Sequence, residues 1–133
     1  MLDRYAIQPT RAHNVDAGLD LYTPKDICVT AGHSAVIDTG VHIEIPCGFV
    51  GFLKSKSGLN VKYGITSEGV IDSGYTGSIV VKLYNNGRDN VSLSAGSKIT
   101  QLVILPCVLD GVQIVDSFQK TERGDNGFGS TGV

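Results

Sequence analysis

Hydrophobic residues recur along this chain with the spacing of β-strands. From Ser34 to Ile45, apolar and polar residues alternate over the second half of the segment, which is typical of a strand with one buried face. The runs Ser78–Tyr84 and Ile99–Leu105 are rich in β-branched residues, which favours strands that are buried more deeply. We therefore predict a chain built mainly of strands.

Turn-forming residues separate these runs at short intervals. They lie at 23–26, 31–33, 46–48, 85–88 and 94–96. Many short strands joined by turns that contain Gly, Pro and Asn are typical of a β-sandwich or barrel. At most one short helix is expected, near residues 58–63. The sequence therefore predicts an all-β fold.

Length and charge narrow the class of protein. A chain of 133 residues with 41% hydrophobic residues fits one globular domain. The 11 basic and 13 acidic residues nearly balance, which disfavours a nucleic-acid or membrane-surface partner. The longest apolar run, Leu102–Cys107, is too short to span a bilayer, and Met1–Arg11 has no apolar run typical of a signal peptide.

The three cysteines, Cys28, Cys47 and Cys107, are odd in number and widely spaced. This spacing disfavours both a disulfide framework and a metal site. We interpret them as reduced, packed thiols in a cytoplasmic protein, in preference to a catalytic thiol.

The last twelve residues, 122–133, differ from the rest because they hold four glycines and almost no apolar side chains. Such a segment is expected to be mobile until a ligand orders it. We predict a barrel at 1–121 and a mobile arm at 122–133. Arg123 offers a planar fork for phosphate, the hydroxyls of Ser130 and Thr131 add donors, and Phe128 offers a stacking face.

Other interpretations of this arm exist. The interval from Gly124 to Gly129 matches the start of a P-loop, but Ser130 stands at the lysine position and no helix follows. Composition alone also fits a plain polar tail. Arg-Gly-Asp at 123–125 is an integrin motif, which has little support without a secretion signal.

Two carboxylates are candidates for chemistry. Asp72 ends the apolar stretch Gly69–Ile71 and is followed by Tyr75, so it is either a general base for water or a turn cap. Asp20 lies between two leucines, where it either faces solvent or holds a metal-bound water. The segment 53–59 adds lysines, serines and a glycine suited to phosphate.

These segments together resemble the five ordered motifs of the trimeric dUTPase family. The matching segments are Ala17-Gly-Leu-Asp-Leu21, Lys56-Ser-Gly58, Gly69-Val-Ile-Asp72 with Tyr75, Gly96-Ser-Lys-Ile-Thr-Gln101 and Arg123-Gly-Asp-Asn-Gly-Phe-Gly-Ser-Thr-Gly132. The resemblance extends from about Leu19 to Val133. It implies a jelly-roll-like β-barrel that forms a homotrimer, in which the arm closes a neighbouring subunit's site.

The resemblance implies hydrolysis of dUTP to dUMP and pyrophosphate, which limits uracil in DNA and supplies dUMP for thymidylate synthesis. Asp72, Gln101 and Asp20 match the catalytic group. Asp72 resembles the carboxylate that orients or deprotonates the attacking water, and Gln101 matches an α-phosphate contact. Asp20 would contact Mg²⁺ through water, while the ion is held mainly by the substrate phosphates.

The remaining matches are to substrate-binding positions. Tyr75 resembles the residue that packs under the deoxyribose. The hairpin from Thr66 through Val70 to Ile71, with Val80 on the next strand, resembles the uracil pocket. Lys56, Ser57 and Gly58 match the β/γ-phosphate site. Arg123, Ser130 and Thr131 match the γ-phosphate clamp, Phe128 matches the lid on uracil, and Gly129 belongs to the same segment.

The chain departs from the family pattern at two positions. Lys56 stands where Arg is common, and Thr66 stands where some relatives use Asn. Two rival functions are a dCTP deaminase, which shares the fold but not this arm, and a non-enzymatic jelly roll, which has no need of Asp20, Asp72 and Gln101 together.

Overall fold

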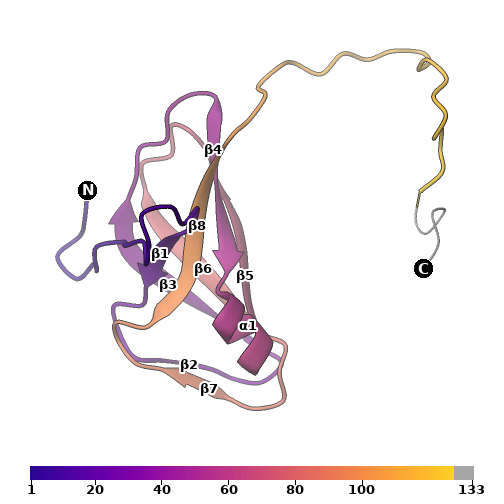
Figure 1. Cartoon of the computed structure of the whole chain (residues 1–133). Coiled ribbons are helices and arrows are strands. Elements are labelled where there is room, and N and C mark those ends of the chain that lie inside the picture. Colours follow the sequence, from indigo (N-terminus) through magenta and orange to yellow (C-terminus); the bar gives the residue numbers. More distant parts are fainter. Residues whose placement is uncertain (128–133) are drawn as a thin grey trace.

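The computed structural model describes residues 1–127, and its centre is a curled six-stranded sheet with the order β1-β8-β4-β5-β6-β3 (Figure 1). The strands of this sheet and of a small second sheet, β2-β7, pair antiparallel. The elements are β1 (Leu19–Tyr22), β2 (Ile27–Val29), β3 (Ser34–His42), β4 (Phe49–Ser55), α1 (Ser57–Tyr63), β5 (Ile65–Ile71), β6 (Ser78–Asn85), β7 (Val91–Leu93) and β8 (Lys98–Pro106). The predicted all-β barrel class and the short helix are confirmed.

The sheet curls around one hydrophobic core. Leu21, Ile37, Leu83 and Leu102, from four different strands, are each at most 1% exposed. Full burial of such a side chain contributes roughly 1.5–3 kcal/mol relative to exposure. The core therefore holds the strands rigidly and positions the turns at their ends.

The prediction of deep burial for the β-branched runs was wrong in part. Along β6, alternate residues are buried and exposed, so Val80 and Tyr84 face outward. The last third of β8 is exposed as well. β-Branched residues favour strands whichever face they occupy, so their density does not report how many faces are covered. Within residues 1–127, no second layer covers the outer face of β6.

Strand β3 ends at His42, three residues before the predicted end at Ile45. Its register with β6 shifts between Asp38 and His42, and Gly40 has φ +66° at the shift. A side chain at this position would also lie 2.7 Å from the ring of Tyr5. Glycine is therefore required for a bulge here, which turns the end of β3.

The cysteine prediction was correct for bonding and wrong for packing. All three thiols are free, but Cys28 and Cys47 are exposed and Cys107 is half-buried. Cys28 occupies the outward position of a three-residue strand, and Cys47 lies in the turn before β4. A short strand has too few residues for its pattern to reveal which face is covered.

The chain leaves the barrel soon after β8. Cys107 donates a backbone hydrogen bond to Gly48 (2.9 Å), and among the described residues no backbone hydrogen bond joins 108–126 to the sheet. This extended segment runs away from the barrel in Figure 1 and is exposed throughout. The strands thus end well before the predicted boundary at residue 121.

No helix within residues 1–127 has the length and apolar character needed to cross a membrane.

Candidate active site

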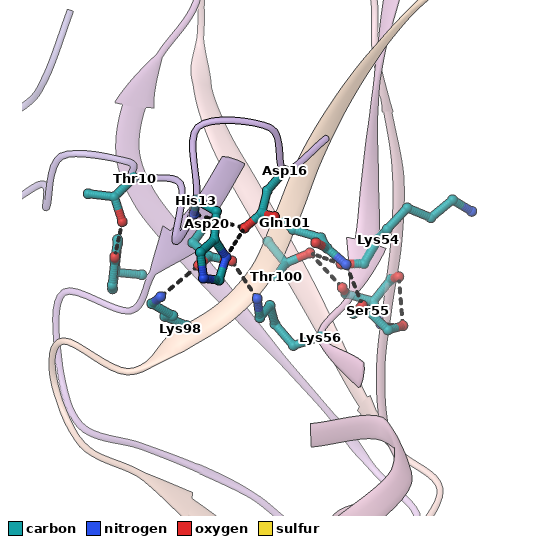
Figure 2. A network of polar contacts seen from close by, with 12 residues as sticks. Thr10, His13, Asp16, Asp20, Lys54, Ser55, Lys56, Lys98, Thr100 and Gln101 are labelled. Carbon is teal, nitrogen blue, oxygen red and sulfur yellow. Dashed lines mark hydrogen bonds and ion pairs between the residues drawn. The ribbon is translucent and has the colours of Figure 1, made fainter. Parts of the chain in front are cut away.

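Asp20 is the centre of a charged cluster on β1 and its neighbours. Its side chain is 5% exposed, and its carboxylate lies 2.5 Å from Lys56 Nζ and 2.8 Å from Lys98 Nζ. Figure 2 shows the carboxylate between the two ammonium groups. The alternative in which the Asp20 side chain faces solvent is therefore excluded. Its buried charge is compensated by two cations.

The two lysines determine the ionisation of Asp20. Burial alone would raise the pKa of Asp20, but hydrogen bonds from Lys56 and Lys98 outweigh it and hold the pKa below its usual value. The same contact raises the pKa of Lys98. Asp20 therefore stays ionised near neutral pH, and the neighbouring pocket is lined by both acidic and basic side chains, from Asp16, Asp20 and Lys56.

That pocket has a volume of about 350 Å³ and is lined by Asp20, Lys56 and Gln101 together with the loop before β1. Gln101 lies opposite Asp20 in the ladder, and its amide donates to the Ser55 carbonyl (3.1 Å). Its amide oxygen lies so close to Gly18 that a Cβ added there would overlap it. Gly18 thus leaves space for the Gln101 side chain at the pocket wall.

Ser57 and Gly58 are exposed and begin α1 directly after Lys56, which lines this pocket. The helix has no acidic residue in its first turn and no side-chain cap at Lys56. The first backbone N–H groups of α1 therefore have no side-chain cap and follow directly after Lys56. The structure brings Asp20, Lys56 and Gln101 together at this pocket, and Ser57 and Gly58 follow Lys56 directly in the chain.

A second candidate region lies where β5 and β6 separate. Ile65–Ser67 pair with β6, whereas Glu68–Ile71 pair with β4, and no registered pair joins β5 to β6 beyond Ser67. Successive residues of an antiparallel strand direct their backbone groups to alternate neighbours. Some backbone donors and acceptors of 68–71 therefore face an opening instead of a strand, as recognition of a base edge requires.

The side chains around this opening divide between its two faces. Val70 and Val80 are exposed on the outer face, whereas Ile71 is 7% exposed and belongs to the core. Only the backbone of Ile71 is therefore available to a ligand. Thr66 lies at the closed end of the opening, where its hydroxyl accepts a hydrogen bond from the Asn86 amide (3.0 Å).

Asp72 and Tyr75 lie on the turn that follows β5. Asp72 is exposed, and within residues 1–127 its carboxylate accepts no hydrogen bond, which disfavours the turn-cap alternative. The Tyr75 hydroxyl donates to the Ser78 carbonyl (2.9 Å), and a Cβ added at Gly77 would overlap that hydroxyl. The ring of Tyr75 therefore lies across Gly77 at the mouth of the opening.

The two regions are far apart in one chain. Ile71 pairs with Gly51, and Gln101 pairs with Lys54 in the adjacent ladder. Asp72 is thus displaced from Gln101 by about four residues and from Lys56 by about six, which is roughly 13 Å and 20 Å along the strands. One chain does not bring Asp72 to the Asp20 pocket.

The arm adds one described candidate. Arg123 is exposed, and its Nε donates to the Asn126 carbonyl (2.9 Å) within a local turn. Phe128, Gly129, Ser130 and Thr131 lie outside the described residues.

Lys98 is a residue of the charged cluster to which the sequence assigned no role. It pairs with Tyr22 in the ladder, a register that places it beside Asp20 and that only the fold reveals.

Comparison with known proteins identifies the family of the chain. The dUTPase family model matches residues 4–132. The chain belongs to the dUTPase family. A deoxyuridine 5'-triphosphate nucleotidohydrolase of Cutibacterium acnes is 43% identical over 129 residues, which are 94% of this chain and 85% of that protein. One from Gloeothece citriformis is 39% identical, covering 99% and 93% of the two chains. This dUTPase family member is thus an enzyme of dUTP hydrolysis.

Solved dUTPases share the fold throughout. The dUTPase of Staphylococcus bacteriophage 80alpha with dUPNHPP superposes with a TM-score of 0.93 at 30% identity, covering 100% of this chain and 96% of that one. A mutant dUTPase from phage phi11 of S. aureus has a TM-score of 0.81 at 29% identity, covering 90% and 95%, and is described with a structural Mg(II) ion.

Proposed function

We propose that this chain forms a homotrimer that hydrolyses dUTP at sites shared between subunits. The observation that carries the proposal is the displacement of roughly 13–20 Å between Asp72 and the pocket of Gln101 and Lys56. A general base and a phosphate contact each act within about 3 Å of the reacting groups. Asp72 of one copy and the Asp20 pocket of another therefore form one site.

In this proposal, the β5–β6 opening binds uracil through its backbone groups, with Val70 and Val80 at its sides and Thr66 at its end. Tyr75 lies under the deoxyribose and leaves no room for a 2′-hydroxyl. The ring lies directly on Gly77, and its hydroxyl donates to the Ser78 carbonyl, which restrains the ring. The opening thus selects base and sugar together.

Lys56, Ser57 and Gly58 bind the β- and γ-phosphates, and Gln101 contacts the α-phosphate. Arg123, Ser130 and Thr131 of an arm clamp the γ-phosphate, while Phe128 covers the base and Gly129 lies between them. Asp72 accepts a proton from a water whose oxygen bonds to the α-phosphorus. The bond to the bridging oxygen breaks in line, and pyrophosphate leaves.

The residues present fit Mg²⁺ held mainly by substrate. Within residues 1–127, no three His, Cys, Asp or Glu side chains gather in a group able to hold a metal. Both Asp20 oxygens are engaged by lysines, so Asp20 is suited to a contact through water and not to direct coordination. When bound, Mg²⁺ would neutralise charge on the phosphates and the leaving group. The product dUMP would supply thymidylate synthesis.

The deciding experiment incubates the protein with each dNTP and Mg²⁺ and measures pyrophosphate and ammonia separately. We expect pyrophosphate from dUTP alone. Ammonia from dCTP would indicate the deaminase that shares this fold, and the absence of both products would indicate a non-enzymatic jelly roll.

A further inference from the structure

The turn that carries Asp72 and Tyr75 is hydrogen-bonded to the end of β3. His42 Nδ1 lies 2.8 Å from the Thr76 carbonyl. A carbonyl oxygen only accepts hydrogen bonds, so Nδ1 carries the proton and donates it. His42 follows the Gly40 bulge, which turns this end of the strand toward the turn.

The other face of the His42 ring is fixed by the N-terminal segment. Nε2 is buried and lies 3.3 Å from Asp3 Oδ1, and within residues 1–127 it makes no hydrogen bond. The backbone holds the same arrangement, because Asp3 donates to the Gly40 carbonyl (2.8 Å) and His42 donates to the Met1 carbonyl (3.0 Å). The imidazole is therefore confined between Asp3 and Thr76.

A second contact ties the same turn to β3. The Ser78 hydroxyl donates to Asp38, whose carboxylate also accepts the Gly40 backbone N–H (3.0 Å). The Ser78 carbonyl in turn accepts the Tyr75 hydroxyl. The bulge between Asp38 and His42 thus anchors both residues that flank Gly77, on which the Tyr75 ring lies.

We propose that His42, held in place by the N-terminal segment, is a positioning residue that sets the sugar specificity of the site through the Thr76 carbonyl. Loss of this bond frees the turn, so Tyr75 no longer excludes a 2′-hydroxyl strictly, and Asp72 is placed less precisely for the attacking water. A displacement of about 1 Å caused far from the reacting atoms is able to reduce the rate by about a hundredfold. Loss of the one hydrogen bond from His42 to Thr76 is therefore sufficient to change the kinetics. The inference rests on the proposed function.

The test compares substitutions that differ in where they place a donor. His42→Asn places its amide near the position of Nδ1 and retains the bond to Thr76, whereas His42→Gln places its amide near Nε2, and His42→Ala has none. His33→Ala is the matched control, because His33 Nδ1 makes the same kind of contact to the Ala31 carbonyl (2.9 Å) in a remote turn. The readouts are kcat and KM for dUTP and UTP, with the melting temperature measured in parallel.

We expect His42→Ala and His42→Gln to lower the ratio of kcat/KM for dUTP to that for UTP by about tenfold, with His42→Asn within about threefold of the wild type. His33→Ala should leave the ratio unchanged. An unchanged ratio in all three His42 variants, or equal losses in Asn and Gln that follow the melting temperature, would overturn the inference. If His42→Ala does not fold, the comparison of Asn with Gln still decides. Wild-type protein without dUTP hydrolysis would instead refute the proposed function.

Discussion

At the scale of single residues, the chemistry depends on how each carboxylate is surrounded. Asp20 is buried and held ionised by two lysines, whereas Asp72 is exposed on a turn with an unoccupied carboxylate among the described residues. The first arrangement suits an electrostatic role and the second suits proton acceptance from water. Sequence neighbours do not distinguish them, because both aspartates border apolar stretches.

Asp72→Asn should lower kcat for dUTP by several orders of magnitude while nucleotide affinity stays nearly constant, because a general base acts mainly in the transition state. Steady-state kinetics and binding of a non-hydrolysable analogue measure the two effects. Asp89→Asn, in the exposed turn after β6, is the control and should be neutral. A kcat within about threefold of the wild type would leave Asp72 as a turn residue only.

Asp38 should contribute to the dependence of stability on pH. Hydrogen bonds from Ser78 and the Gly40 backbone hold its pKa below the usual value. The unfolded state therefore binds more protons near pH 4, so this stabilisation is present above the unfolded pKa and is lost as pH falls through the folded pKa.

Asp38→Asn should accordingly flatten the loss of unfolding free energy between about pH 5 and pH 3, with a cost at pH 7 of about 1 kcal/mol or less, because Asp38 is exposed. Urea unfolding at several pH values measures this slope. Asp110→Asn, at an exposed position in the segment after β8, should retain the wild-type slope. If the unfolding free energies of wild type and Asp38→Asn change with pH in parallel, the Asp38 carboxylate contributes nothing to the pH dependence of stability.

At the scale of elements, the sequence predicted strands, turns and the short helix, because period, β-branching and Gly/Pro/Asn turns are local signals. Asp20 on β1, Gln101 on β8 and Lys56 just after β4 line one pocket. Three features depended on tertiary pairing: the bulge at Gly40, the switch of β5 from β6 to β4, and the ion pair of Lys98. No local pattern encodes which strand lies next to which, so these features required the fold.

The arm at 122–133 should be dispensable for folding and essential for activity. Among the described residues, 122–126 are exposed and make no backbone hydrogen bond to the sheet. Deletion after Thr121 should therefore leave the melting temperature nearly unchanged while hydrolysis collapses, since Arg123 and the donors beyond it are lost. Calorimetry and pyrophosphate release measure the two outcomes.

A narrower change within the arm is Phe128→Ala, which should lower kcat/KM about 5- to 100-fold, because base stacking is typically worth ~1–3 kcal/mol. Gln119→Ala, at an exposed position before the arm, should have little effect. Full activity of the truncated chain would mean that the segment is a plain polar tail.

At the scale of the whole molecule, a single chain leaves large apolar side chains exposed. The extended segment after β8 exposes several large apolar side chains, namely Val108, Leu109, Val112, Ile114 and Phe118. The outer face of β6 adds Val80 and Tyr84. Contiguous exposed apolar surface is characteristic of protein interfaces. These surfaces support the proposed association of copies.

Light scattering should give the mass of a trimer, and two inactive variants should complement each other. Mixing Asp72→Asn chains with chains truncated after Thr121, followed by subunit exchange, should restore part of the activity, because some sites then receive an intact Asp72 and an intact arm. Either variant exchanged with itself is the control and should stay inactive. A monomeric mass with full activity would contradict the shared site.

Under the proposed shared site, the register that separates Asp72 from Gln101 also makes catalysis depend on mass action. A site divided between copies exists only while the copies are associated, so activity per chain should fall on dilution below the dissociation constant of the assembly. A nucleotide that contacts two copies at once binds only the associated state, and by linkage it shifts the equilibrium toward that state. Substrate would then stabilise the assembly, and the largest fraction of chains would be associated when dUTP is abundant.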